Sequence, residues 1–249
     1  MSELIITPEW PAAANIRACV STRMGGVSEG GYQSLNLASH VGDDPARVQE
    51  NRRRFRMAAG LPQEPAWLNQ VHGVTVVHHG PESHARQDAD ACWTAQANTP
   101  CAVLTADCLP VLFSSLDGTV VAAAHAGWRG LCAGVLEATL QALPVPPGQM
   151  LAWLGPAIGP GAFEVGVEVR EAFVRATAKD AAAFAAHGQR YYANLFALAR
   201  ARLQRSGVAG IYGGDSCTVT QEDRYFSHRR DAPRLGGSGR FASVIWRLG

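Results

Sequence analysis

A thiol and an imidazole on neighbouring strands are the clearest chemical feature of this sequence. Two apolar runs flank Asp117-Gly118, and an Asp-Gly pair between such runs predicts a β-hairpin in which both turn residues take positive φ. A two-residue loop there places His125 opposite Pro110. Cys108 lies two residues before Pro110, so Cys108 and His125 point to the same face, about 7–8 Å apart as diagonal neighbours. A cysteine beside a histidine suits either zinc binding or nucleophilic catalysis.

Spacing alone does not identify a third partner for this pair. His72 is the best placed, because it follows an apolar segment and precedes Gly73. The other histidines considered lie farther along a predicted strand or in polar segments: His78, His79, His40 and His84. A Cys-His-His set would leave the fourth position of a zinc ion open to water, which is the pattern of catalytic zinc.

A positive charge follows the pair along the chain. Arg129 lies four residues after His125, near the start of a predicted helix, and this combination suits a phosphate or another oxyanion. The aromatic and basic segment Tyr225–Asp231 either lines a pocket for a planar ring or forms an amphipathic surface loop.

The elements that must position these residues follow from local signals. Asp44-Pro45 caps and begins a helix that Gly60 ends. Further helices are predicted at Gly130–Leu143, Val167–Ala178 and Tyr191–Ser206. Strands are predicted at Ile16–Arg23, Ala66–Val71, Thr75–His79, Cys101–Ala106, the two hairpin runs, Met150–Leu154 and Phe241–Trp246. Loops are predicted at Met24–Gly31, expected to be mobile, and at Gly80–Asp88 and Gly155–Gly161.

The hairpin strands are apolar on both faces, so their sheet is expected to be covered on both sides. The chain shows no internal repeat and no linker that would divide it. We therefore predict a mixed α/β or α+β fold in which residues 1–249 form a single domain.

Composition limits the classes of partner. Of 249 residues, 47% are apolar, which indicates a globular protein. The formal net charge of +1 and the absence of a basic stripe argue against nucleic acid as a partner. The short run Arg52–Arg54 is interpreted as a solvated helix face. No segment approaches the roughly 20 apolar residues of a membrane span, so no membrane partner is expected.

The cysteines indicate a reducing compartment. The six are irregularly spaced without a C-x-x-C pair, and the N-terminal segment lacks the basic region and long apolar run of a signal peptide. We therefore expect free thiols and a cytoplasmic protein. Cys101 and Cys132 match the inert buried cysteine of an apolar run, whereas Cys108, preceded by Asp107, does not.

Multi-residue motifs along nearly the whole chain resemble one family. The chain resembles the YfiH family, also described as DUF152, laccase-domain proteins and zinc-dependent purine nucleoside phosphorylases. The matching motifs are Ser34-Leu-Asn-Leu37, Trp67-Leu-Asn-Gln-Val-His-Gly73, Thr105-Ala-Asp-Cys-Leu-Pro110, His125-Ala-Gly-Trp-Arg-Gly130, Leu154-Gly-Pro-Ala-Ile-Gly159, Gly213-Gly-Asp-Ser-Cys-Thr218 and Tyr225–Arg230.

The resemblance implies a ligand set and an activity. It implies zinc, or copper, held by His72, Cys108 and His125, and a fold like that of cytotoxic-necrotizing-factor catalytic domains, with mixed sheets layered with helices. It implies phosphorolysis of adenosine, inosine and methylthioadenosine, and hydrolytic deamination of adenosine. Purine nucleosides and phosphate are then the partners of a monomer or weak homodimer. The residues expected to contact substrate are Asn36, Gln70, Arg129 and His228.

The catalytic roles allow alternatives. In the nucleoside reaction, Arg129 would hold phosphate and Asp107 would move protons. A metal-free hydrolase or amidase would instead use Cys108 as nucleophile and His125 as base. Copper-dependent polyphenol oxidation is less favoured, because the eight histidines include no His-x-His pair, although copper can bind one Cys-His-His set. A non-enzymatic metal-binding module would leave the glycine-rich loops and Arg129 without a role.

Overall fold

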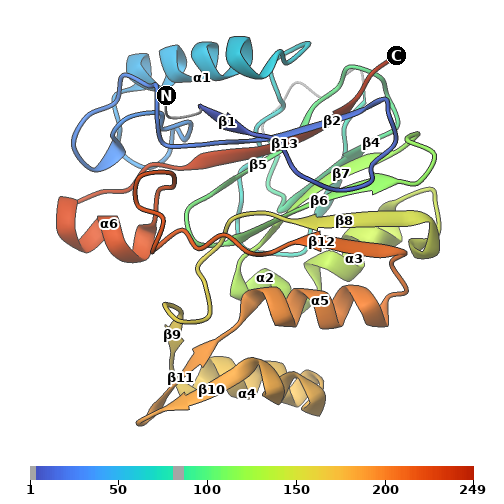
Figure 1. Ribbon diagram of the computed structural model, residues 1–249, viewed down its shortest axis with the longest axis vertical. Helices are drawn as coiled ribbons and strands as arrows, with labels where there is room; N and C mark the ends of the chain where they lie inside the picture. The colour runs from blue at the N-terminus through green and yellow to red at the C-terminus, as the bar shows by residue number, and fades with distance from the viewer. Residues whose placement is uncertain (1–3, 81–86) are drawn as a thin grey trace.

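Two β-sheets face each other at the centre of the fold, with helices on their outer faces (Figure 1). The computed structural model describes residues 4–80 and 87–249. The first sheet is antiparallel and has the order β1 (Ile5–Ile6), β2 (Ile16–Ser21), β13 (Phe241–Arg247), β5 (Cys101–Thr105). The second has the order β12 (Gly210–Gly213), β8 (Met150–Leu154), β6 (Leu109–Ser115), β7 (Val121–Ala126), β4 (Ala91–Thr94), β3 (Val76–His78).

The second sheet is parallel only at its two edges, between β12 and β8 and between β3 and β4. A third, small sheet has the order β10 (Phe184–His187), β11 (Arg190–Ala193), β9 (Glu164–Val165) and lies below the others in Figure 1. The α-helices are α1 (Pro45–Ala59), α2 (Trp128–Ala133), α3 (Val135–Ala142), α4 (Val167–Ala176), α5 (Leu195–Arg205) and α6 (His228–Leu235). Short 3-10 helices span Gly30–Tyr32, Pro147–Gln149 and Ala178–Ala183.

Three apolar clusters correspond to the layers. The cluster between the two large sheets includes Val103, Leu112 and Ile245. Phe55 of α1 packs with Leu104 on the outer side of the four-stranded sheet. The largest cluster joins α3 and α5 to the other face of the six-stranded sheet. Every residue of β6 and β7 is buried, as expected for strands covered on both faces. The predicted mixed α/β fold is confirmed.

The hairpin has the predicted register but a different turn. Pro110 pairs with His125, as counted from the sequence. Gly118 has φ 69°, whereas Asp117 is not in the left-handed region. The Ser115 hydroxyl accepts the N–H groups of Thr119 and Val120, so a side chain closes the turn and only one turn residue needs positive φ.

Some boundaries are as predicted. The Asp44 side chain accepts the Ala46 N–H at the start of α1, and Gly60 ends the helix at φ 61°. Helix α4 and strands β2, β5, β8 and β13 also lie where the sequence placed them.

Other predictions were wrong for local reasons. Ala66–Val71 is not a strand, because the N–H of Val71 is bound by the Asp90 carboxylate and only an isolated bridge forms there. Gly134, at φ 103°, divides the predicted helix 130–143 into α2 and α3. The helix predicted from Tyr191 begins only after Asn194, whose side chain accepts the Ala197 N–H.

Three further expectations concern the segment 24–31, the burial of Cys132 and the segment 80–88. The segment predicted as a mobile loop at 24–31 is largely exposed or half-buried, and it is attached to the protein at Ser28, which is buried and donates to Asp43. Cys132 is half-buried and not fully buried. His84 and most of the predicted loop 80–88 lie outside the described residues.

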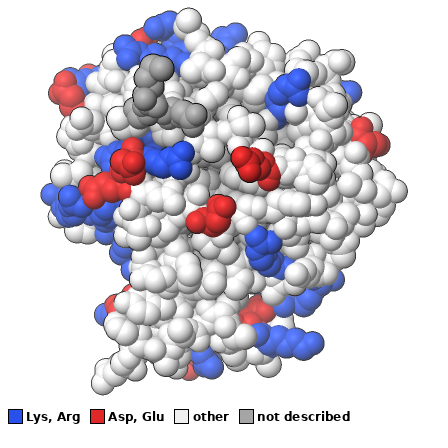
Figure 2. All heavy atoms as spheres, in the orientation of Figure 1, with Lys and Arg blue, Asp and Glu red and all other residues white. Residues whose placement is uncertain are grey.

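Charges of both signs are interspersed among the described residues on the face shown in Figure 2. Within the described part of the chain, no helix is both long and apolar enough to cross a bilayer.

Candidate active site

His72, Cys108 and His125 converge on one point. One ligand atom from each lies within 4.8 Å of the other two. The two imidazole rings meet edge to face, with centroids 4.7 Å apart. His125 is buried, Cys108 is half-buried and His72 is exposed, so the cluster extends from the interior to the surface. The geometry therefore offers a donor set with one side open to a small molecule.

Asp90 organises two of these residues. It precedes β4 and lies opposite the end of β7, so that its carboxylate reaches His125 Nδ1 at 2.7 Å. The same carboxylate accepts the backbone N–H groups of His72 at 3.0 Å and Gly73 at 2.6 Å. It thereby leaves Nε2 of His125 free for the cluster and holds His72 in its unusual backbone conformation at φ 60°.

Asp90 was not predicted from the sequence. Finding it required the pairing of β4 with β7, and no local signal specifies that pairing. The only hint is the position of a carboxylate directly before an apolar run.

Cys108 is held by the turn between β5 and β6. Asp107 takes φ 87° there, a conformation in which a non-glycine residue needs support. Its carboxylate accepts the Thr218 hydroxyl at 2.6 Å and the Arg229 N–H at 2.7 Å. Both carboxylate oxygens are thus bound within the protein, which favours a positioning role for Asp107 over the predicted transfer of protons.

Gly127 leaves the space in which the donors meet. A Cβ atom at this residue would lie 2.8 Å from His72 Nδ1 and 3.0 Å from Cys108 Sγ. His72 Nδ1 and Cys108 Sγ thus both border the space that Gly127 leaves. One thiol and two imidazole nitrogens are donors that zinc and copper accept, and His125 has the carboxylate partner typical of a metal-binding histidine. These residues fit a metal ion.

The electrostatics of the cluster favour a bound cation. Burial lowers the pKa of His125, but Cys108 and the hydrogen bond to Asp90 outweigh it and raise that pKa to about 9. Burial and the neighbouring His125 lower the pKa of His72. Burial opposes ionisation of Asp90, yet the hydrogen bonds from His125 and Gly73 keep its pKa below the usual range. The surroundings of His125 therefore favour positive charge, which a metal ion held by these residues would supply.

Two arginines lie near the donors. Arg129 is exposed, stacks on Trp128 at 4.5 Å and contributes to the low pKa of His72. Arg240 was not predicted. It precedes β13, and the pairing of β13 with β5 brings it to the strand end that leads to Cys108. Burial lowers the pKa of Arg240, while Cys108 and Asp107 act on it in the opposite direction. No ion pair to either arginine is found within residues 4–80 and 87–249.

The predicted substrate residues have mainly structural contacts. Asn36 is buried, and its amide donates to Ala38 and Asp43 and accepts from Ala38 and Arg240. Its capacity for hydrogen bonds is therefore filled, and it positions Arg240.

Gln70 is similarly engaged. Its side chain exchanges two hydrogen bonds of 2.8 Å with the backbone of Leu104, which fixes the segment before His72 against β5. His228 is the exposed first residue of α6, one residue before Arg229, which binds Asp107. Direct contact of Asn36 or Gln70 with substrate is not supported by these arrangements.

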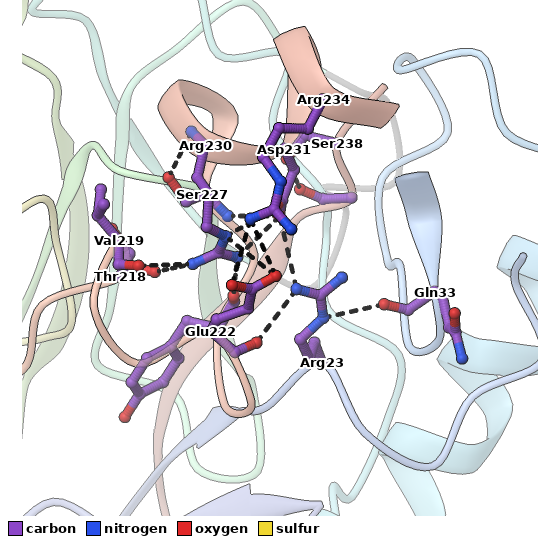
Figure 3. Close-up of polar contacts among 12 residues, drawn as sticks. Arg23, Gln33, Thr218, Val219, Glu222, Ser227, Arg230, Asp231, Arg234 and Ser238 are labelled. Atoms are coloured by element: carbon purple, nitrogen blue, oxygen red, sulfur yellow. Dashed lines mark hydrogen bonds and ion pairs between the residues drawn. The ribbon is translucent and has the colours of Figure 1, made fainter. Parts of the chain in front are cut away.

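A buried ion-pair network anchors the segment that supports Asp107. Arg230 binds Asp231 through two bonds of 2.7 and 2.9 Å and donates to the carbonyl of Thr218 at 2.6 Å. Arg23, at the end of β2, lies 3.6 Å from the same carboxylate (Figure 3). The network thus ties Thr218 and the start of α6 to the four-stranded sheet.

Comparison with known proteins agrees with this geometry. A family model described as "Multi-copper polyphenol oxidoreductase laccase" matches residues 17–248. "Purine nucleoside phosphorylase YfiH" of Escherichia coli is 55% identical over 248 residues, covering 100% of both chains. A purine nucleoside phosphorylase of Pseudomonas aeruginosa is 54% identical and covers 97% of each chain.

Solved structures show the same fold. A Neisseria meningitidis protein of the DUF152 family model superposes with a TM-score of 0.93 at 50% identity, covering 99% of this chain and 100% of the other. YlmD of Geobacillus stearothermophilus has a TM-score of 0.88 at 30% identity, covering 97% and 94%. Full-length similarity in sequence and in structure shows that the chain belongs to the YfiH family.

Proposed function

We propose that this protein is a zinc-dependent purine nucleoside phosphorylase that acts on adenosine, inosine and methylthioadenosine. The observation that carries the proposal is the open donor set of His72, Cys108 and His125 beside two arginines. Relatives that cover 97–100% of the chain at 54–55% identity are named purine nucleoside phosphorylases.

The donor set would hold the metal through an imidazole nitrogen of His72, Cys108 Sγ and His125 Nε2. When bound, a zinc ion supplies Lewis-acid chemistry at this position. Asp90 keeps His125 in the tautomer that presents Nε2, and Asp107 fixes the turn that carries Cys108. These residues therefore set the position and protonation of the donors without contacting substrate.

The arginines would bind phosphate. A guanidinium group matches a phosphate with paired N–H donors, and two such groups compensate its charge. Arg240 is positioned by Asn36 and by its own bonds to Ser238 and Gly239, whereas Arg129 is exposed and supported by Trp128. Arg240 is thus suited to fix the oxyanion and Arg129 to attract it.

We extend the proposal to phosphate-independent deamination of adenosine at the same site. Water as well as phosphate would have access to the exposed side of the cluster. Phosphate as co-substrate would give phosphorolysis, and water would give deamination. Cytosolic supplies of nucleosides and phosphate would serve both reactions.

The test is a chromatographic assay of zinc-loaded protein with adenosine and inosine, with and without phosphate. Phosphorolysis predicts free base and ribose 1-phosphate only with phosphate, and deamination predicts inosine from adenosine without it. Arg240→Lys should lower the phosphate-dependent rate more than the deamination rate, because it loses the paired donors while metal content is unchanged. Arg175→Lys, on the exposed end of α4, is the control. Absence of base, inosine and ribose phosphate would refute the proposal.

A metal-free cysteine hydrolase is the second candidate. Cys108, His125 and Asp90 have the order of a nucleophile, a base and an orienting carboxylate, with 2.7 Å between His125 Nδ1 and Asp90. Chelation distinguishes the two candidates. A chelator should abolish the activity of a zinc enzyme and leave that of a metal-free hydrolase unchanged, whereas Cys108→Ala should abolish either activity. Amide hydrolysis that survives chelation would favour the hydrolase.

A further inference from the structure

We propose that His79, Cys92 and Cys101 form a second binding site for a thiophilic metal ion, Zn²⁺ or Cu⁺, between the two large sheets. One ligand atom from each of the three residues lies within 4.8 Å of the other two. The set shares no residue with the cluster of His72, Cys108 and His125, and it contains two thiols where that cluster has one.

The sheets themselves bring these residues together. Cys92 lies on β4 of the six-stranded sheet, and Cys101 begins β5 of the four-stranded sheet. Both side chains point into the layer between the sheets and are fully buried. His79 follows β3, the neighbour of β4, and is 3% exposed. The three donors thus come from two sheets and enclose one interior point.

His79 has an unsatisfied polar atom at this point of the core. No hydrogen-bond partner is found for its buried Nδ1 among the described residues. Its backbone is fixed, because its N–H donates to Trp93 at 2.8 Å and its carbonyl accepts the Thr94 hydroxyl at 2.7 Å. A buried imidazole nitrogen without a partner costs free energy that a metal bond would recover.

The two thiols are not chemically equivalent. A hydrogen bond from Cys101 opposes burial and, together with His79, lowers the pKa of Cys92 to about 5. Burial and the neighbouring Cys92 raise the pKa of Cys101. Ionisation is thus easier for Cys92 than for Cys101, and metal binding would displace the thiol protons. Cys19 has a different environment. It is an isolated buried thiol, and burial raises its pKa to about 12.

The size of the set suits a soft metal ion. Bonds of about 2.3 Å to sulfur and about 2.0–2.1 Å to nitrogen place tetrahedral ligand atoms roughly 3.5–3.8 Å apart. The present separations are no greater than 4.8 Å, so side-chain rotation and a small contraction would close the site. Two thiolates and an imidazole favour Zn²⁺ or Cu⁺ over hard cations.

A cavity adjoins one side of this set. A cavity of about 550 Å³ is lined by His79 and by Pro100, the residue before Cys101. The remaining lining includes polar groups of Gln96 and Thr99. The two thiols do not line this cavity, so an ion entering through it would meet His79 first.

The test is zinc stoichiometry by mass spectrometry on protein produced in zinc-supplemented medium and dialysed without chelator. We expect two zinc ions per parent chain, one in Cys108→Ala, one in the double variant Cys92→Ala/Cys101→Ala and none in the triple variant. Cys19→Ala, which removes a buried thiol from another cluster, should retain two. Circular dichroism verifies that each variant is folded.

Cobalt spectroscopy tests the site with both core cysteines intact. Co²⁺ bound to Cys108→Ala should give a thiolate-to-metal charge-transfer band about twice as intense, per ion, as Co²⁺ bound to Cys92→Ala/Cys101→Ala. A parent chain with one zinc ion that Cys108→Ala loses completely, or a Cys108→Ala spectrum without a thiolate band, would overturn the proposal. Neither readout depends on nucleoside turnover.

Discussion

At the residue scale, Asp90 controls the geometry of the donor set. Its carboxylate binds His125 Nδ1 and the backbone N–H groups around His72. We predict that Asp90→Asn lowers zinc affinity by about 10–100-fold, the usual cost of losing a carboxylate behind a metal-binding histidine. Competition with a chromophoric chelator measures this change. Asp88→Asn, two residues earlier and exposed, is the control, and equal affinity in both variants would contradict the assigned role.

Gly127 provides a second test at this scale. A Cβ at 2.8 Å from His72 Nδ1 and 3.0 Å from Cys108 Sγ must displace both donors. We predict that Gly127→Ala loses at least about tenfold in zinc affinity, comparable with the loss of a supporting partner. Gly161→Ala adds the same methyl group where no atom lies within 4 Å, and should bind zinc like the parent. A normal affinity for Gly127→Ala would show that the donors meet elsewhere.

At the element scale, the ion-pair network places α6 against the site. Asp231 is fully buried between Arg230 and Arg23 (Figure 3). The chain that leads into α6 and the first turn of α6 supply the two hydrogen-bond donors of Asp107, the Thr218 hydroxyl and the Arg229 N–H. Removing the carboxylate leaves two largely buried cations without compensation. We predict that Asp231→Ala lowers the free energy of unfolding by about 3–5 kcal/mol in urea titrations. The exposed Asp223→Ala should change it by no more than about 0.5 kcal/mol. Equal free energies of unfolding for Asp231→Ala and Asp223→Ala would refute the anchoring role of Asp231.

The same scale shows what the sequence could predict. Residues governed by local signals were predictable: the Asp44 cap, the Gly60 stop and the register that places His125 opposite Pro110. Residues that depend on pairing between distant strands were not. The pairing of β4 with β7 brings Asp90 to His125, 35 residues away in the chain. The pairing of β13 with β5 brings Arg240 near Cys108, more than 100 residues away. His72 was the best placed of several histidines in the sequence, and only the resemblance proposed it as the third ligand.

At the scale of the whole molecule, the donor set joins both sheets. His125 lies near the end of β7 in the six-stranded sheet, and Cys108 lies in the turn that connects β5 of the four-stranded sheet to β6. His72 precedes β3 at the edge of the larger sheet. A bound ion therefore links segments that unfolding would separate, and its binding free energy contributes to the stability of the entire fold.

This linkage predicts a thermal shift. A ligand at about 1,000 times its dissociation constant stabilises the folded state by about 4 kcal/mol when it does not bind the unfolded chain. For a chain of about 250 residues, each kcal/mol raises Tm by about 2–4 °C, so zinc should raise the Tm of chelator-treated protein by roughly 8–16 °C. Calorimetry with and without zinc measures the shift, and Cys108→Ala should show a smaller one because it lacks the thiolate that connects β5 and β6 to the ion. An equal shift in parent and variant would place the stabilising ion away from Cys108.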